Sequence, residues 1–492
     1  MQFNSIDFAI FFPIVLIVYF VIPKKLRAVF LLAASYYFYM SWNAKYALLI
    51  AFSTIATYLS ALMFRRFEKH KKLILAACII VNLAILFLFK YADFAIDTLN
   101  LILSHFGTVR IGARLGFLLP VGISFYTFQA LGYIIDVYRG DVEAERNIIK
   151  YALFVSFFPQ LVAGPIERSR NLLGQIRNIE KICVWNAKAV TSGAILMVYG
   201  LFMKMVIADR ASILADKVFN NYRIYGSVEL ILALIVFGIQ IYCDFSSYSM
   251  IAIGAARIMG FKLMENFNAP YFATSIKDYW SRWHISLSSW FKDYLYFPLG
   301  GSRKGKSRTM VNVMIIFLVS GLWHGANLTY ILWGAIHGAF RVVEDLTLPL
   351  RQKAALRLHV RTDTFSHRLW QSIFAFLVVT FSWIFFRSAT ITDAFIYLGR
   401  IISRPDPWVL FNDGLYTLGL KRPEMNILIV SVVILFLVDL IREKKKMTID
   451  KFLMEQNLWF EWLVIIGLIL MILTFGKYGP AFDAKQFIYF QF

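Results

Sequence analysis

Long apolar segments, repeated along most of the chain, are the feature that most restricts its fold. Segments long enough to cross or nearly cross a bilayer lie at residues 6–23, 27–42, 45–64, 72–91, 113–137, 149–163, 185–208, 228–250, 308–325, 327–345, 369–388, 425–442 and 457–475. A bilayer core needs roughly 20 apolar residues per helix, and only helices and closed barrels satisfy their backbone hydrogen bonds within it. The 492 residues are 59% hydrophobic and 16% charged. These properties predict an all-α, polytopic integral membrane protein.

Basic residues lie between the apolar segments and predict the orientation of the chain. The formal net charge is +21, with clusters at 24–27, 65–72 and 442–446. Because such clusters stay in the cytoplasm, we expect the N-terminus outside. A single apolar segment follows the last cluster, so the tail at 476–492 is also predicted to be extracytoplasmic. The basic charge is thus explained by topology, and no nucleic-acid-binding motif accompanies it.

The interval 262–307 is too polar to cross a bilayer but is rich in tryptophan, tyrosine and phenylalanine. Irregular backbone at membrane depth is tolerated when it is buried in protein or faces water. This interval is therefore predicted to be interfacial or re-entrant. The basic segment 346–368 is predicted to be a cytoplasmic loop or a surface helix.

Two histidines interrupt apolar segments, each beside tryptophan and glycine. An ionisable residue at membrane depth is costly, so it indicates either function or a hydrogen-bonded contact between helices. For His324 both interpretations are open, and a buried neutral imidazole is the form that accepts a proton. For His337 the structural interpretation is favoured, since no second polar residue lies close to it in sequence.

His284 and Asp244 are two further polar residues in aromatic surroundings. The position of His284 is compatible with orienting a ligand, supporting a reacting group or anchoring at the headgroup level. For Asp244 the favoured interpretation is an ion pair with an arginine such as Arg257 or Arg282.

Proline and glycine inside the apolar stretches 120–129 and 158–168 predict helix breaks or close helix contacts. Broken helices also build transporter sites, so these stretches suit a transporter equally well. Phosphate-binding glycine loops, His-Glu-x-x-His and Gly-x-Ser-x-Gly are missing from the sequence, which disfavours an ATP-driven or redox enzyme. Its three dispersed cysteines predict neither a disulfide framework nor a metal centre.

Longer stretches resemble the membrane-bound O-acyltransferase family, and within it the bacterial alginate O-acetyltransferase-like branch. From about Pro120 to Gly338 they are PVGISFYTFQALGYIIDVYRG, FFPQLVAGPIERS, YCDFSSYSMIAIGAARIMGF, ENFNAPYFATSIKDYWSRWHISLSSWFKDYLYFPLGG and SGLWHGANLTYILWGAIHG. The resemblance implies roughly 11–14 transmembrane helices, with re-entrant or interfacial helices around a central catalytic funnel. It also implies one membrane domain over 1–475, with its motif core at about 120–338, and a separate tail at 476–492.

The resemblance also implies roles for both histidines. In that family the histidine of the Trp-His-Gly motif is catalytic, which implies this role for His324. The histidine of the Trp-His-x-Ser-Leu-Ser motif is the second residue tied to activity, here His284. The middle stretch departs from the family pattern at Ser247 and Met250, where glycine and aspartate are expected. These departures bear on helix packing and on that aspartate, not on the histidines.

The last residues, 486–492, resemble the C-terminal Phe-Ile-Tyr-Phe-x-Phe motif of the same branch. In related teichoic acid systems a similar motif resides on a separate small protein. Its tyrosine is proposed to carry the acyl group to an extracellular serine-dependent transferase. The resemblance therefore implies that Tyr489 is an acyl shuttle. The alternative is an aromatic anchor of the last helix at the membrane surface.

The resemblance implies a membrane-bound O-acetyltransferase of the bacterial inner, cytoplasmic membrane. Acetyl-coenzyme A would be a cytoplasmic donor substrate rather than a permanently bound cofactor. An extracellular SGNH-type, serine-dependent transferase would pass the acetyl group to a cell-surface or secreted polysaccharide. A phenol with an ordinary pKa of about 10 is a weak nucleophile, so we expect His324 to act as base toward Tyr489. His284 would position the thioester or stabilise its oxyanion.

Cationic residues near the motif core are predicted to hold the phosphates of coenzyme A, namely Arg282, Lys292, Arg303 and Lys304. The positive-inside rule explains these residues equally well. Two other functions remain open: a D-alanyl transferase of the teichoic acid type, and a non-covalent transporter of acyl groups or polysaccharide. The fused tail argues against D-alanyl transfer, and the tyrosine that it carries argues against transport.

Overall fold

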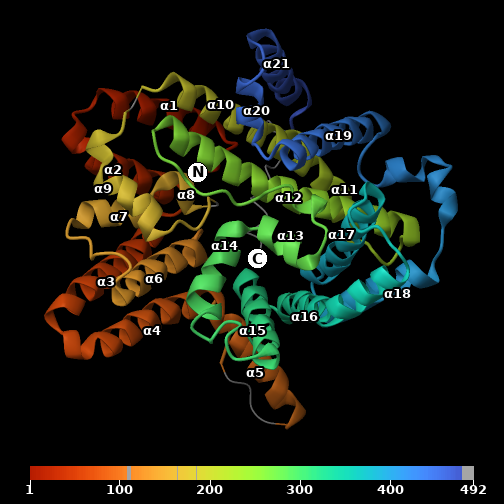
Figure 1. Ribbon diagram of the computed structural model, residues 1–492, viewed down its shortest axis with the longest axis horizontal. Helices are drawn as coiled ribbons and strands as arrows, with labels where there is room; N and C mark the ends of the chain where they lie inside the picture. The colour runs from red at the N-terminus through yellow and green to blue at the C-terminus, as the bar shows by residue number, and fades with distance from the viewer. Residues whose placement is uncertain (108–111, 163, 184, 479–492) are drawn as a thin grey trace. The chain divides into compact units, whose positions relative to one another are not determined.

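The computed structural model of the chain describes residues 1–107, 112–162, 164–183 and 185–478, and every regular element in these ranges is a helix (Figure 1). The predicted all-α fold is thereby confirmed. Within the described residues, seven helical segments are long and apolar enough to cross a membrane: Ala44–Arg66, Glu68–Lys90, Ala187–Asn220, Ser227–Ile258, Phe365–Arg387, Arg422–Lys445 and Leu458–Phe475. Shorter apolar helices cover Ile6–Val21 and Ile148–Leu161. The chain is a multi-pass membrane protein, as its composition predicts.

The chain divides into two compact units, the first formed by residues 1–194 and 251–264. Its helices are α1 (Ile6–Val21), α2 (Arg27–Met40), α3 (Ala47–Arg66), α4 (Lys71–Lys90), α5 (Ala92–His105), α6 (Ile123–Arg139), α7 (Ile148–Ser156), α8 (Phe158–Leu161) and α9 (Gly174–Arg177). Two longer helices, α10 (Ala187–Phe202) and α12 (Ser227–Ile258), are divided between the units.

The stretches with proline and glycine meet inside the first unit. Gly122 precedes α6 with a φ of 72°, and a Cβ atom there would lie 2.5 Å from the carbonyl oxygen of Leu161. Gln160 donates to the side chain of Gln129 at 2.7 Å and to the carbonyl of Phe154 at 3.0 Å. The predicted breaks and close contacts are confirmed. Buried side-chain amides donate hydrogen bonds to backbone carbonyls that the breaks leave without a helical partner.

The second unit comprises residues 195–250 and 265–492. Its helices are the π-helix η6 (Met203–Ala208), α11 (Asp209–Asn220), α13 (Ile276–Arg282), α14 (Ile285–Phe291), the π-helix η8 (Lys292–Tyr296), α15 (Lys306–His324), α16 (Leu328–Arg357), α17 (Phe365–Arg387), α18 (Ile391–Ser403), α19 (Arg422–Lys445), α20 (Ile449–Met454) and α21 (Leu458–Phe475). The predicted surface segment 346–368 begins as the end of α16 and continues into a turn.

The aromatic interval 262–307 forms the short helices α13, α14 and η8 rather than a membrane-crossing helix, as predicted. Ser275 caps α13 by accepting a hydrogen bond from the amide of Asp278 at 3.0 Å. The break between α13 and α14 is held by the preceding segment, because the amide of Asn268 donates to Arg282 and the amide of Ile285 donates to Asn266. This arrangement fixes the direction in which α14 leaves the break.

Candidate active site

Glycines bring α15 and α16 into direct backbone contact. A Cβ atom on Gly321 of α15 would lie 2.2 Å from the carbonyl oxygen of Tyr330, and one on Gly334 of α16 would lie 2.2 Å from that of Phe317. Real Cβ atoms do not approach so closely, so larger residues at either position would separate the helices. Small residues of this kind let membrane helices pack tightly. This packing sets the position of the last turn of α15, where His324 lies.

His324 is the last residue of α15 and is buried. Three aromatic rings surround its imidazole nearly edge-on. The ring centroids lie 5.0 Å away for Trp323, 5.1 Å for Trp333 and 5.5 Å for Phe386. The carbonyl end of a helix carries partial negative charge, which stabilises positive charge on an imidazole that has accepted a proton. The predicted burial of His324 is confirmed, and its position at a helix end suits a base.

His284 occupies the residue before α14 and is also completely buried. Its backbone is left-handed, with φ 44° and ψ 53°, which is unfavourable for a residue with a side chain. Such strained positions cluster at functional sites. Burial lowers the pKa of His284 from 6.5 to about 3, so its imidazole is neutral at physiological pH. A neutral imidazole carries one N–H donor and one acceptor nitrogen.

Trp323 lies next to both predicted histidines. Its ring centroid is 5.8 Å from that of His284 and 5.0 Å from that of His324. The structure therefore brings together, around one tryptophan, two residues that belong to separate sequence motifs. Phe245 packs against His284 from α12, with ring centroids 4.6 Å apart at 88°.

Asn266 connects the motif around His284 to the motif on α12. Its side-chain oxygen accepts the hydroxyl of Ser286 at 2.6 Å, and its amide donates to Ser249 at 3.0 Å. Its backbone carbonyl accepts the amide of Ile285 at 2.9 Å. Asn266 was not predicted as a site residue from the sequence. A signal was present, because this asparagine lies within one of the resembling stretches and is flanked by Glu265 and Phe267.

The middle motif accommodates its departure from the family pattern. Ser247, which replaces the expected glycine, is buried on α12, and its hydroxyl donates to the carbonyl of Asp244 at 2.7 Å. The hydroxyl thus finds its hydrogen-bond acceptor within its own helix. The second departure, Met250, is partly exposed on the same helix.

Asp244 forms an ion pair, as interpreted, but its partner is a lysine. Lys204 of η6 lies 2.6 Å from the carboxylate of Asp244 and 2.9 Å from that of Asp209, and all three groups are buried. The arginines named in the sequence interpretation contact other groups. Arg257 donates to Ser192, and Arg282 donates to Asp278 and Glu443.

His337 is held from both sides by hydrogen bonds. Trp280 donates to its Nδ1 at 3.3 Å, and its Nε2 lies 2.8 Å from the hydroxyl of Ser382. That hydroxyl donates to the carbonyl of Val379, so Nε2 of His337 carries the proton and donates to Ser382. With both nitrogens engaged, the predicted structural role of His337 is the better description. Trp333 lies against this histidine at 4.9 Å and against His324 at 5.1 Å.

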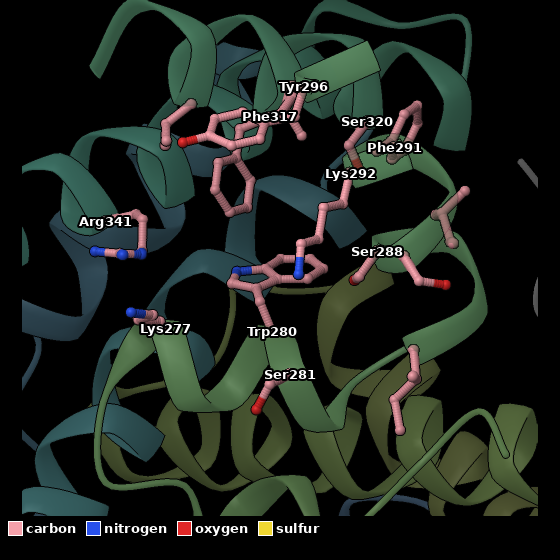
Figure 2. A pocket seen from close by; sticks show the side chains of 15 residues that line it. Lys277, Trp280, Ser281, Ser288, Phe291, Lys292, Tyr296, Phe317, Ser320 and Arg341 are labelled. Carbon is pink, nitrogen blue, oxygen red and sulfur yellow. The ribbon is translucent and has the colours of Figure 1, made fainter. Parts of the chain in front are cut away.

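A pocket of about 430 Å³ is lined by residues of α13, α14, η8, α15 and α16, and the three histidines are not among its lining residues (Figure 2). Its walls are mainly apolar and aromatic, and Trp280, the donor to His337, is one of them. The lining includes Ile285, which follows His284 in sequence, and Ser320, one helical turn before His324. The pocket therefore reaches residues that adjoin both histidines.

Three cations line the pocket: Lys277, Lys292 and Arg341. Lys277 and Arg341 lie toward the same side in Figure 2, and both approach Glu344, through the backbone amide of the lysine and the guanidinium of the arginine. Arg341 also pairs with Asp345 at 2.5 Å. An apolar pocket with a few cations suits a molecule with both an apolar part and anionic groups.

The structure separates the four cations that were predicted to hold phosphates. Lys292 lines the pocket. Arg282 pairs with Asp278 at 2.7 Å and with Glu443 at 2.6 Å, so its charge is balanced within the protein. Arg303 and Lys304 are exposed in the turn before α15 and are not among the pocket-lining residues. Their role in binding the donor remains a prediction.

The predicted shuttle residue, Tyr489, lies outside the described residues. The start of the tail is described. Lys477 pairs with Glu424 at 2.5 Å, and its backbone amide donates to the carbonyl of Met205 at 3.0 Å. Arg210 donates to the carbonyl of Phe475 at 2.6 Å. The chain after α21 is thus tied to the beginning of α19 and to the π-helix η6.

Buried histidines and a cation-bearing pocket, in an all-helical membrane protein, are compatible with a membrane enzyme that moves an acyl group. The sequence signature of MBOAT, the membrane-bound O-acyltransferase family, matches residues 142–388. A probable alginate O-acetylase AlgI of Pseudomonas putida is 36% identical over 502 residues, covering 99% of both chains. The peptidoglycan O-acetyltransferase of Helicobacter pylori is 32% identical over 420 residues, covering 78% of this chain and 76% of that protein.

A more distant relative is the teichoic acid D-alanyltransferase of Bacillus subtilis, 30% identical over 231 residues, covering 44% of this chain and 56% of that protein. The chain belongs to the membrane-bound O-acyltransferase family, which confirms the predicted resemblance. It is an O-acyltransferase, so the enzymatic interpretation is favoured over the transport alternative.

Proposed function

We propose that this O-acyltransferase moves an acetyl group from cytoplasmic acetyl-coenzyme A across the inner membrane of a bacterium. His324 would activate the acceptor hydroxyl, which we assign to Tyr489. An extracytoplasmic SGNH-type transferase would then O-acetylate a cell-surface or secreted polysaccharide. The observation that carries the proposal is the buried His324 at the end of α15, one helical turn beyond a residue of a cation-bearing pocket.

The reaction is an exchange of one acyl bond for another. The phenol of Tyr489 loses its proton to His324 while its oxygen attacks the thioester carbonyl carbon. The new acyl C–O bond forms and the C–S bond breaks, and His324 returns the proton to the departing thiolate. A general base within hydrogen-bond reach is required because a phenol is a weak nucleophile at neutral pH.

We assign to His284 the stabilisation of the negative charge that develops on the thioester oxygen. Its neutral imidazole offers an N–H donor, and burial raises the electrostatic value of that donor. The strained backbone and the hydrogen bonds of Asn266 fix the starting point of α14. A donor that is already oriented loses little entropy on meeting the transition state.

We assign the pocket to the binding of the acyl donor, acetyl-coenzyme A. Lys277 and Lys292, and to a lesser degree Arg341, would face the phosphates of acetyl-coenzyme A, and the apolar walls would face its pantetheine arm. No carboxylate pairs with Lys277 or Lys292 among the described residues, so both charges are available to an anion.

The position of helix α19 is an argument for acyl transfer between the two sides of the membrane. Its last turns carry Glu443, which pairs with Arg282 of α13, and α13 contributes residues to the pocket. Its first turn carries Glu424, which pairs with Lys477 at the start of the tail. A helix of 24 residues is about 36 Å long, enough to cross a bilayer core. The pocket residues and the tail are thus tied to opposite ends of one span, whose basic end is cytoplasmic by the positive-inside rule.

Purified full-length protein in lipid vesicles, given acetyl-coenzyme A, tests the proposal. Mass spectrometry should find acetyl on Tyr489, and the label should be lost in Tyr489→Phe and reduced at least about 100-fold in His324→Gln. His105→Gln, at an exposed histidine, is the matched control and should label normally. Turnover by a Tyr489→Phe variant would refute the shuttle, and full labelling of His324→Gln would refute the base.

D-alanyl transfer is the second candidate, favoured by the similarity to the Bacillus subtilis teichoic acid D-alanyltransferase. The same vesicles given a D-alanyl thioester of a carrier protein distinguish the two. We expect labelling from acetyl-coenzyme A, because relatives that match most of this chain are O-acetylating proteins.

A further inference from the structure

Phe386 closes the space beside His324 on the side of α17. It is the penultimate residue of that helix, and its ring lies 5.5 Å from the imidazole at 72°. It belongs to the first layer of side chains around the histidine, together with Trp323 and Trp333. A group that reacts next to His324 therefore meets the Phe386 ring or one of its aromatic neighbours.

Phe386 is wedged among other rings. Tyr330 lies 4.9 Å from it, Trp333 5.2 Å and Trp383 5.3 Å, all between 68° and 88° in orientation. Tyr330 is itself confined, because a Cβ atom on Gly325 would lie 2.1 Å from its ring. Protein interiors packed in this way resist added volume, and forcing one extra group into them is unfavourable. The Phe386 ring cannot swing aside without displacing its neighbours.

We propose that Phe386 is a specificity-determining residue that limits the acyl group to a short chain. This inference rests on the proposed function, since it takes His324 as the base at the reacting carbonyl. In the acyl transfer described above, the C–S bond breaks and a C–O bond forms at a carbon held beside His324. A two-carbon acyl group ends in one methyl group there. Each added methylene extends toward space that the aromatic side chains fill.

Phe386 is a better place to test this limit than its neighbours. Trp323 also packs on His284, and Trp333 also packs on His337. Truncating either tryptophan therefore disturbs a second histidine. Phe386 lies on α17, and although its ring packs on Tyr330 and Trp333 of α16, the backbone contacts of Gly321 and Gly334 that join α15 to α16 do not involve that ring.

The chain provides a matched control in the next residue. Phe385 is on the same helix and equally buried, but its ring packs on Phe381 at 5.8 Å and on Phe395 at 5.7 Å. Phe385→Ala therefore removes the same atoms from a buried site on another face of α17. Any effect of general destabilisation should appear in both variants, whereas a change in chain-length preference should appear in one.

The experiment compares two-, three- and four-carbon acyl donors with full-length protein in vesicles. Each donor is supplied as the coenzyme A thioester and as the N-acetylcysteamine thioester, which lacks the nucleotide. The wild type should prefer acetyl. In Phe386→Ala the ratio of kcat/KM for butyryl over acetyl should rise about 10-fold or more, since one methylene in a pocket changes discrimination by that order. Phe385→Ala should keep the wild-type ratio. Phe386→Leu, a milder change that preserves the fold more safely, should admit propionyl first.

Equal use of butyryl and acetyl by the wild type would overturn the inference, as would an unchanged ratio in both Phe386 variants. A ratio that shifts equally in Phe385→Ala would overturn it too. Failure of the proposed donor is a separate result: the wild type would then turn over the N-acetylcysteamine thioesters but not acetyl-coenzyme A, and the chain-length ratio would still be read from the smaller donors.

Discussion

Gly321 and Tyr330 touch through their backbones: a Cβ atom on Gly321 would lie 2.2 Å from the carbonyl oxygen of Tyr330. This contact joins α15 to α16 one turn before His324. We predict that Gly321→Ala lowers the free energy of unfolding by about 1–3 kcal/mol, because the helices must separate to admit the methyl group. Acyl transfer should fall by more than stability alone explains, since His324 moves with α15. Unfolding in detergent and initial rates of transfer measure the two effects.

Gly399 of α18 is the control for this change. A Cβ atom there meets nothing within 4 Å. Gly399→Ala should leave activity unchanged and stabilise the protein by about 0.4–1 kcal/mol, by restricting the unfolded chain. If the two variants behave alike, close packing of α15 and α16 does not position His324.

A second prediction concerns acid. Burial lowers the pKa of His284 to about 3 from an unfolded value of 6.5, so the unfolded chain binds the extra proton first as the pH falls. The stability tied to this neutral histidine is complete above about pH 6.5 and is lost as the pH falls toward 3. The slope is at most about 1.4 kcal/mol per pH unit. Thermal unfolding of wild type and His284→Asn between pH 7 and 4 should show a shallower pH dependence in the variant.

Asparagine suits this test because it tolerates the left-handed backbone of position 284 and does not titrate. His70→Asn, at an exposed histidine, should retain the wild-type slope. Parallel pH profiles for wild type and His284→Asn would contradict the assignment of a buried neutral imidazole.

The ion cluster of Lys204 gives a third prediction. Its ammonium lies between the buried carboxylates of Asp209 and Asp244. Lys204→Met removes the cation that both share and should cost about 3–5 kcal/mol, as expected when a buried pair loses a partner. Asp244→Asn keeps the pair with Asp209 and should cost less. Denaturant unfolding in detergent ranks the stabilities of the two variants. If Lys204→Met were as stable as Asp244→Asn, the prediction that Lys204 balances the charge of both carboxylates would be refuted.

Sequence was sufficient for properties that local patterns encode. Apolar length predicted the helices, and the cost of an ionisable residue in an apolar segment singled out His324. Aromatic and charged residues in alternation predicted that the interval 262–307 does not cross the bilayer, and the structure shows the short helices α13 and α14 there. The resemblance then assigned His284 to the same site, and the structure places both histidines beside Trp323.

Contacts between distant segments were beyond sequence patterns. Lys204 lies 40 residues before Asp244, inside a π-helix whose altered turn decides which way the side chain points. Phe386 is one of several phenylalanines on an apolar helix, and its place beside His324 depends on how α17 packs. Lys292 was predicted, but the other two cations of the pocket were missed for the same reason, since Lys277 and Arg341 come from separate helices.

The hydrogen bonds of His337 lead to a final prediction that separates a structural histidine from a reacting one. Ser382 accepts the Nε2 proton of His337 at 2.8 Å, and both residues are buried. Ser382→Ala leaves the Nε2–H of His337 without its acceptor and should lower the free energy of unfolding by about 1–3 kcal/mol. Replacing His337 by Phe removes this donor but also the acceptor of the Trp280 N–H, so the coupling between His337 and Ser382 is measured with a double-mutant cycle. The rate of acyl transfer per folded molecule should stay within a few fold of wild type in Ser382→Ala. In His324→Gln it should be lost while stability is nearly unchanged. Loss of transfer in well-folded Ser382→Ala would show instead that His337 takes part in the chemistry, acting through Trp333 on the ring of His324.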